Sequence, residues 1–92
     1  MRISVLGVGR LGASHAATLA GVPGVTELTV YDADPARAKD VAAPLKGRVK
    51  ARAVGSIDEA FTAADAMVIV TPTDTNAPLI KRAIDQGLPT FC

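Results

Sequence analysis

Three glycines with the spacing GxGxxG, namely Gly7, Gly9 and Gly12, follow a short run of branched apolar residues, Arg2 to Leu6. In this pattern the first glycine allows a tight turn, the second lets the backbone approach a pyrophosphate, and the third lets a helix pack closely on a strand. Free N–H groups at the start of that helix then bind the anion. The spacing therefore indicates dinucleotide binding, with a purely structural turn as the alternative.

An acid ends the next apolar run, Glu27 to Tyr31, because Asp32 lies about twenty residues after Gly12. A carboxylate at this point can accept hydrogen bonds from both ribose hydroxyls of an adenosine and repels a 2′-phosphate. The sequence thus favours NAD over NADP, although Arg37 is near enough to pair with a 2′-phosphate. The alternative for Asp32 is a loop aspartate that assists the helix cap made by Asp34.

No other residue qualifies as a catalytic group or a metal ligand. His15 is the only histidine and has no nucleophile or acid partner, so we expect it to pack or to face a partner. The basic run from Lys46 to Arg52 lacks interleaved aromatic residues, which favours protection of an edge strand over nucleic-acid binding. Thr71 and Pro72 form either a turn or a cofactor contact. Cys92, the only cysteine, is expected to be buried or incidental.

Strands and helices alternate along the chain. We expect strands at residues 2–6, 27–31, 48–54, 66–70 and 88–92. The first helix runs from Leu11 to Ala20, and the second begins at Asp34–Pro35 and ends at Gly47. Ser56 and Glu59 form a capping box for a short third helix. The inner face of a fourth helix is predicted from four apolar residues at helical spacing: Leu79, Ile80, Ala83 and Ile84.

This alternation predicts an α/β fold in which a doubly wound parallel sheet of about five strands has helices on both faces, giving three layers. The expected strand order is 3-2-1-4-5. Ligands of such sheets bind beyond the carboxyl ends of the strands, where the order reverses between strands 1 and 4. The loops after Leu6, Tyr31 and Val70 should converge there.

Length and composition exclude several classes of protein. A chain of 92 residues has room for one small core, so separate cofactor and substrate domains cannot both fit. Its 49% hydrophobic and 21% charged residues are globular values, and a net charge of +1 gives no basic footprint for nucleic acid or an anionic membrane. The longest apolar run, residues 66–70, is too short to span a membrane, and no signal segment is evident. We therefore expect a soluble, cytoplasmic protein.

Taken together, the motifs resemble the amino-terminal domain of the Gfo/Idh/MocA oxidoreductases, in particular inositol 2-dehydrogenase-like members. The segments that carry the resemblance are GVGRLGASHA (7–16), VYDADPARA (30–38) and VTPTDTNAPLIKRAIDQGLPTFC (70–92). The resemblance spans the whole chain and implies that residues 1–92 form an NAD(P)-binding Rossmann domain. In this family a second α/β domain binds a sugar or polyol, whose secondary alcohol gives a hydride to the nicotinamide.

The resemblance also implies roles for individual residues. Asp32 would hold the adenosine ribose, and Thr71 and Pro72 would border the nicotinamide end. Asn76 stands where these proteins usually have a histidine, and its amide can form hydrogen bonds but cannot titrate near neutral pH. The residues implied to cradle the pyrophosphate are Gly7, Gly9, Arg10, Leu11 and Gly12.

The family's catalytic lysine lies in a Glu-Lys-Pro motif that directly follows the segment ending here at Cys92, and further catalytic residues lie in the second domain. We therefore expect a truncated dehydrogenase that binds NAD without turnover, since no residue pair here offers a base. The uncovered strand at 88–92, with Leu88 and Phe91, is a predicted site of self-association. The alternative is a nucleotide-sensing or minimal Rossmann module without catalysis.

Overall fold

Five parallel strands form a single sheet in the order β3-β2-β1-β4-β5, as predicted. The computed structural model describes residues 1–91, without the side chain of Thr73, so the expectation for Cys92 falls outside the described residues. The central strands are entirely or almost entirely buried, whereas β3 at one edge alternates basic exposed and apolar inner positions. The strands are β1 (Arg2–Leu6), β2 (Glu27–Tyr31), β3 (Lys50–Ala53), β4 (Ala66–Ile69) and β5 (Thr90–Phe91).

Four α-helices connect the strands, and two begin at the caps that the sequence predicts. Asp34 accepts a hydrogen bond from the Ala36 N–H at 3.1 Å, and Ser56 accepts one from the Glu59 N–H at 3.1 Å. Such caps satisfy N–H groups that the first helical turn leaves unpaired. The helices are α1 (Arg10–Ala20), α2 (Pro35–Ala42), α3 (Ile57–Thr62) and α4 (Thr73–Asp85), and a 3-10 turn, η1 (Ala43–Leu45), follows α2.

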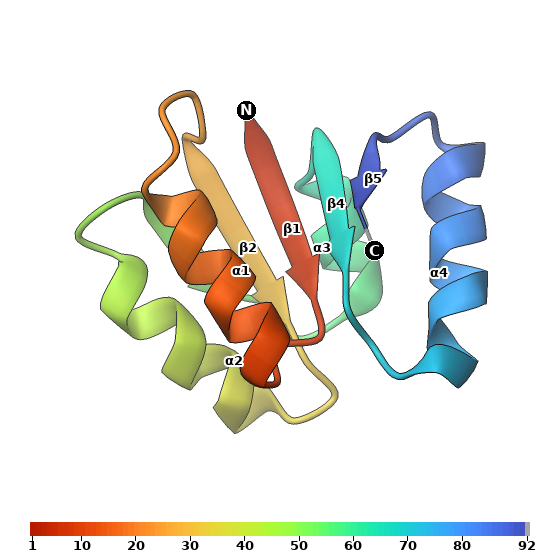
Figure 1. Ribbon diagram of the computed structural model, residues 1–92, viewed down its shortest axis with the longest axis horizontal. Helices are drawn as coiled ribbons and strands as arrows, with labels where there is room; N and C mark the ends of the chain where they lie inside the picture. The colour runs from red at the N-terminus through yellow and green to blue at the C-terminus, as the bar shows by residue number, and fades with distance from the viewer. Residues whose placement is uncertain (92) are drawn as a thin grey trace.

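The sheet separates two apolar clusters, which gives the predicted three layers (Figure 1). On one face, α1 and α2 bury Ala16, Ala20, Ala38 and Ala42 against β1 and β2. On the other face, α3 and α4 cover the sheet, with Phe61 as the largest side chain of that cluster. Small alanines on α1 and α2 let these helices approach the sheet closely, which fixes where the loops at its carboxyl edge lie.

One apolar side chain differs from the sequence expectation. Ile84, predicted on the inner face of α4, is 65% exposed, because α4 lies at the margin of the sheet beside a β5 of only two residues (Figure 1). Leu11, at the second position of α1, is 63% exposed. The other three predicted inner residues of α4, Leu79, Ile80 and Ala83, do pack in the second cluster.

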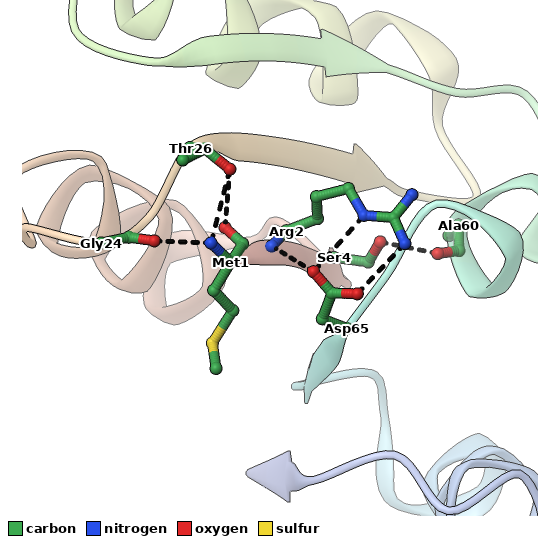
Figure 2. A network of polar contacts seen from close by, with 7 residues as sticks. All are labelled: Met1, Arg2, Ser4, Gly24, Thr26, Ala60 and Asp65. Atoms are coloured by element: carbon green, nitrogen blue, oxygen red, sulfur yellow. Dashed lines mark hydrogen bonds and ion pairs between the residues drawn. The ribbon is translucent and has the colours of Figure 1, made fainter.

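A polar network joins the amino ends of β1 and β4 (Figure 2). The Asp65 carboxylate accepts hydrogen bonds from the Arg2 backbone N–H at 2.8 Å and from its guanidinium at 3.0 Å, while the Asp65 N–H donates to the Arg2 carbonyl. The guanidinium, as the largest cause, lowers the pKa of Asp65 below its usual value. Deeper in the fold, the Ser4 hydroxyl donates to the Ala60 carbonyl at 2.6 Å and ties β1 to α3.

Within residues 1–91, none of the helices combines the length and apolar character that crossing a membrane requires. The same part of the chain has no cluster of three or more His, Cys, Asp or Glu side chains arranged to hold a metal ion.

Candidate functional site

The loops after β1, β2 and β4 meet at the carboxyl edge of the sheet, toward which the arrows of these three strands point (Figure 1). A half-open cleft of about 540 Å³ lies at this edge. Five residues that the sequence tied to dinucleotide binding line it: Gly7, Asp32, Arg37, Thr71 and Pro72. The strand order reverses between β1 and β4, so the cleft lies where open α/β sheets bind their ligands.

The protein's own backbone requires two of the three glycines. Gly7 has a φ of +87°, and a Cβ built there would lie 2.8 Å from the Val70 carbonyl oxygen. A Cβ on Gly12 would lie 1.9 Å from the Gly7 carbonyl oxygen. Contacts this short cannot form, so Gly7 and Gly12 let β1, the start of α1 and the end of β4 pack together.

Gly9 differs from both. Its φ is −66°, which an L residue can adopt, and a Cβ built there meets no protein atom within 4 Å. Gly9 is the N-cap of α1, which has neither a side-chain cap nor an acid in its first turn. The first N–H groups of that turn therefore have neither an intrahelical acceptor nor a side-chain cap, and the turn begins at an exposed glycine. This arrangement fits the approach of an anion to the backbone, as a pyrophosphate requires.

Asp32 joins the glycine loop to the loop after β2. Its Oδ2 accepts a hydrogen bond from the Val8 N–H at 2.9 Å, and its Oδ1 accepts one from the Asp34 N–H at 2.8 Å. Asp34 in turn caps α2, so the alternative role, a helper for that cap, is present in the structure. Asp32 is also half-buried in the cleft lining, where its remaining lone pairs can accept hydrogen bonds from hydroxyl groups.

The cleft lining does not include three further predicted site residues, Gly9, Gly12 and Asn76. The Thr71 hydroxyl donates to Asn76 Oδ1 at 2.7 Å, which leaves the Asn76 NH₂ group as a donor beside the cleft wall. Arg10 and Leu11 are exposed on the first turn of α1 and are not part of the cleft lining. Arg37, which the sequence suggested could pair with a 2′-phosphate, does line the cleft.

Sequence reasoning missed an apolar part of the cleft. Ala33 follows Asp32, Ile57 begins α3, and Leu79 lies one helical turn after Thr75 on α4. The carboxyl end of β3 reaches the same edge of the sheet, so the segment after β3, which contains Ile57, could have been predicted to lie near the cleft. Asp74 and Thr75 complete the lining. The lining thus combines polar and apolar groups, which suits a ligand with both a sugar and a flat base.

His15 lies away from this cleft. It is exposed on α1 and lines a separate groove with Leu19, Val70 and Phe91, beside the margin of the sheet. Phe91 on β5 is 69% exposed, whereas Leu88 is partly buried against the second apolar cluster. Self-association at this margin stays a prediction.

Comparison with known proteins identifies what this arrangement is similar to. Residues 1–92 match the model of the GFO_IDH_MocA family, described as an oxidoreductase family with an NAD-binding Rossmann fold. The chain is 40% identical over 92 residues to an inositol 2-dehydrogenase of Rhizobium meliloti, covering all of this chain and 27% of that protein. It is 38% identical over 88 residues to a UDP-N-acetylglucosamine 3-dehydrogenase of Acidithiobacillus ferrooxidans, covering 96% of this chain and 26% of that protein.

A solved structure has the same fold with a dinucleotide bound. GenD2 from gentamicin A biosynthesis, crystallised in complex with NAD, is 28% identical and superposes with a TM-score of 0.86. The superposition covers 98% of this chain and 25% of that one. The chain thus spans about a quarter of the length of the relatives that it matches.

Proposed function

From the premise that this chain belongs to the Gfo/Idh/MocA oxidoreductase family, we propose that it binds NAD in the cleft at the carboxyl edge of its sheet. The observation that carries the proposal is Gly9. The fold requires Gly7 and Gly12 but leaves open space where a Gly9 side chain would lie. A ligand that approaches the backbone explains why glycine stands at this position.

The residues around the cleft can each take part in binding. The uncapped N–H groups of α1 would hold the pyrophosphate, and Asp32 would accept hydrogen bonds from the adenosine ribose. The apolar side chains of Ala33, Ile57 and Leu79 would pack on the adenine. Thr71 and Pro72 in the lining, with Asn76 hydrogen-bonded to Thr71, would border the nicotinamide end.

The charges in the cleft favour NAD over NADP. A 2′-phosphate on the ribose would lie beside the Asp32 carboxylate, and close like charges cost several kcal/mol. Arg37 opposes this preference because its guanidinium lines the same cleft. We therefore propose that NADP binds more weakly than NAD but measurably.

We place this domain in a dehydrogenase that moves a hydride between NAD and the secondary alcohol of a polyol or sugar. The similarity to the inositol 2-dehydrogenase supports this substrate class. Bound NAD would supply the hydride acceptor, and a base must take the alcohol proton. We propose that the 92-residue chain on its own binds the cofactor without turnover, since it spans about a quarter of the length of its dehydrogenase relatives.

Isothermal titration calorimetry of the folded chain with NAD and NADP, separately, tests this proposal. We expect saturable NAD binding and an NADP affinity at least about tenfold lower, a difference of about 1.4 kcal/mol. Circular dichroism in the same buffer establishes that the chain is folded. A folded chain that takes up neither dinucleotide, or that prefers NADP, would contradict the proposal.

A further inference from the structure

The Asp32 carboxylate uses both of its oxygens on backbone N–H groups. Oδ2 bonds to the Val8 N–H inside the glycine loop, and Oδ1 bonds to the Asp34 N–H at the start of α2. These two N–H groups belong to different loops, 24 and 2 residues away in the sequence. One carboxylate therefore fixes the relative position of two loops that border the cleft.

The Val8 N–H depends on this carboxylate. Val8 is almost entirely buried, at 1% exposure, and its side chain lies in the first apolar cluster. A buried N–H that loses its only partner keeps the full cost of its removal from water, so this bond holds the loop in place. The preceding N–H, of Gly7, donates to the Tyr31 carbonyl at 2.8 Å, so successive N–H groups of the glycine loop are bonded to the end of β2 and to the residue after it.

We infer that Asp32 is a positioning residue for the phosphate-binding loop, in addition to its proposed contact with the ribose. By holding Val8, the carboxylate fixes the backbone that leads into Gly9 and the first turn of α1. The anion-binding N–H groups are then ordered before the ligand arrives, which lowers the entropic cost of binding. This inference rests on the proposed function only for its effect on affinity, because the two hydrogen bonds join groups of the protein itself.

The two possible roles of Asp32 predict opposite changes in the affinity for an anionic ligand when Asp32 is replaced by asparagine. If Asp32 only contacts the ribose, removing its negative charge favours the binding of any anion beside it. If Asp32 positions the loop, the amide oxygen of asparagine can accept only one of the two bonds and its NH₂ group faces the other N–H donor. The loop then loses order, and even a phosphate ligand without a ribose binds more weakly.

Amide hydrogen exchange measured by NMR on the ligand-free chain is the first arm of the test. In the wild type, we expect the Val8 and Asp34 amides to be protected. In Asp32→Asn they should exchange at least about tenfold faster, while core amides such as Leu28 keep their rates. Asp40→Asn, an exposed substitution on α2, is the matched control and should change neither rate. Unprotected Val8 and Asp34 amides in the wild type would overturn the inference even if the variant does not fold.

Calorimetric titration with inorganic pyrophosphate and with NAD is the second arm. We expect Asp32→Asn to weaken both ligands by at least about fivefold and to gain no affinity for NADP, with Asp40→Asn at the wild-type values. Unchanged or tighter pyrophosphate binding with unchanged exchange rates would overturn the positioning role and leave the ribose contact. A wild type that does not bind NAD would instead refute the proposed function, and the exchange rates would still decide the positioning role.

Discussion

Gly12 and Gly7 approach each other so closely that a single carbon atom added to Gly12 would lie 1.9 Å from the Gly7 carbonyl oxygen. The same added carbon would lie 3.0 Å from a methyl group of Val70, at the end of β4. The first turn of α1 therefore packs directly on the backbone of the glycine loop. The nearest atoms, the carbonyl oxygen and carbon of Gly7, belong to the main chain, so they cannot move aside without shifting β1 or α1.

This contact predicts a large loss of stability in Gly12→Ala. We expect the free energy of unfolding in urea to fall by about 3 kcal/mol or more, because the overpacked atoms are backbone. Gly47→Ala is the matched control, since a Cβ there meets nothing within 4 Å, and it should change stability by less than about 1 kcal/mol. Equal stability of the two variants would show that the packing at Gly12 has been misjudged.

Ser4→Ala should destabilise the fold although it makes β1 more apolar. The Ser4 hydroxyl is fully buried and donates to the Ala60 carbonyl at 2.6 Å (Figure 2), so alanine removes that partner from a buried acceptor. An unsatisfied buried acceptor costs about 1–3 kcal/mol, measurable as a lower urea midpoint with an unchanged slope. Ser14→Ala, on the exposed side of α1, is the control and should not lose stability. A Ser4→Ala chain as stable as this control would rule out the effect.

The bond between Arg2 and Asp65 predicts a dependence of stability on pH. The Arg2 guanidinium lowers the pKa of Asp65, so the unfolded chain takes up this proton at a higher pH than the folded chain does. The contribution is present above the unfolded pKa and is lost as the pH falls through the folded pKa. We expect the stability difference between wild type and Asp65→Asn to be constant from about pH 7 to pH 5 and to shrink below about pH 4.

Urea titrations at each pH measure this difference. Both side chains are 46% exposed, so added salt should also reduce it. Asp40→Asn serves as the control and should show no such pH dependence. A wild-type advantage over Asp65→Asn that persists unchanged to about pH 2 would refute the assignment.

Arg37→Ala should sharpen the choice between the two dinucleotides. Arg37 lines the cleft with Asp32, and we propose that it offsets part of the repulsion of a 2′-phosphate. Its loss should lower the affinity for NADP by at least about threefold and change the affinity for NAD by less than about twofold, as measured by calorimetry. Arg48→Ala, at an exposed position before β3, controls for the loss of net charge. An unchanged ratio of the two affinities would place Arg37 outside the 2′-phosphate position.

The sheet order and most element bounds were predictable because their signals are local. The residues of β1 and β2 match the expected ranges, and Asp34 and Ser56 cap their helices as their positions predict. The predicted edge strand is shorter in the structure, at Lys50–Ala53, since parallel pairing with β2 sets its ends. The prediction that Ile84 lies on the inner face of α4 was wrong, because helical spacing shows that a face is apolar but not how much sheet lies beneath it.

Contacts between distant segments explain what the sequence did not predict at the site. The bonds from Asp32 to Val8 and from Arg2 to Asp65 connect residues 24 and 63 positions apart, and they depend on strand register. Ile57 and Leu79 enter the cleft from helices whose tilt no periodicity specifies. The glycine spacing predicted the loop, but only the structure distinguishes Gly9 from the two glycines that packing requires.

The most direct test of the account is the NAD affinity of Gly9→Val, measured by calorimetry beside its free energy of unfolding. Because a side chain at Gly9 enters open space, we predict a stability within about 1 kcal/mol of the wild type. The same side chain should block the approach of the pyrophosphate and weaken NAD by at least about tenfold, while Gly47→Val keeps the wild-type affinity. A folded Gly9→Val chain that binds NAD as tightly as the wild type would contradict the account.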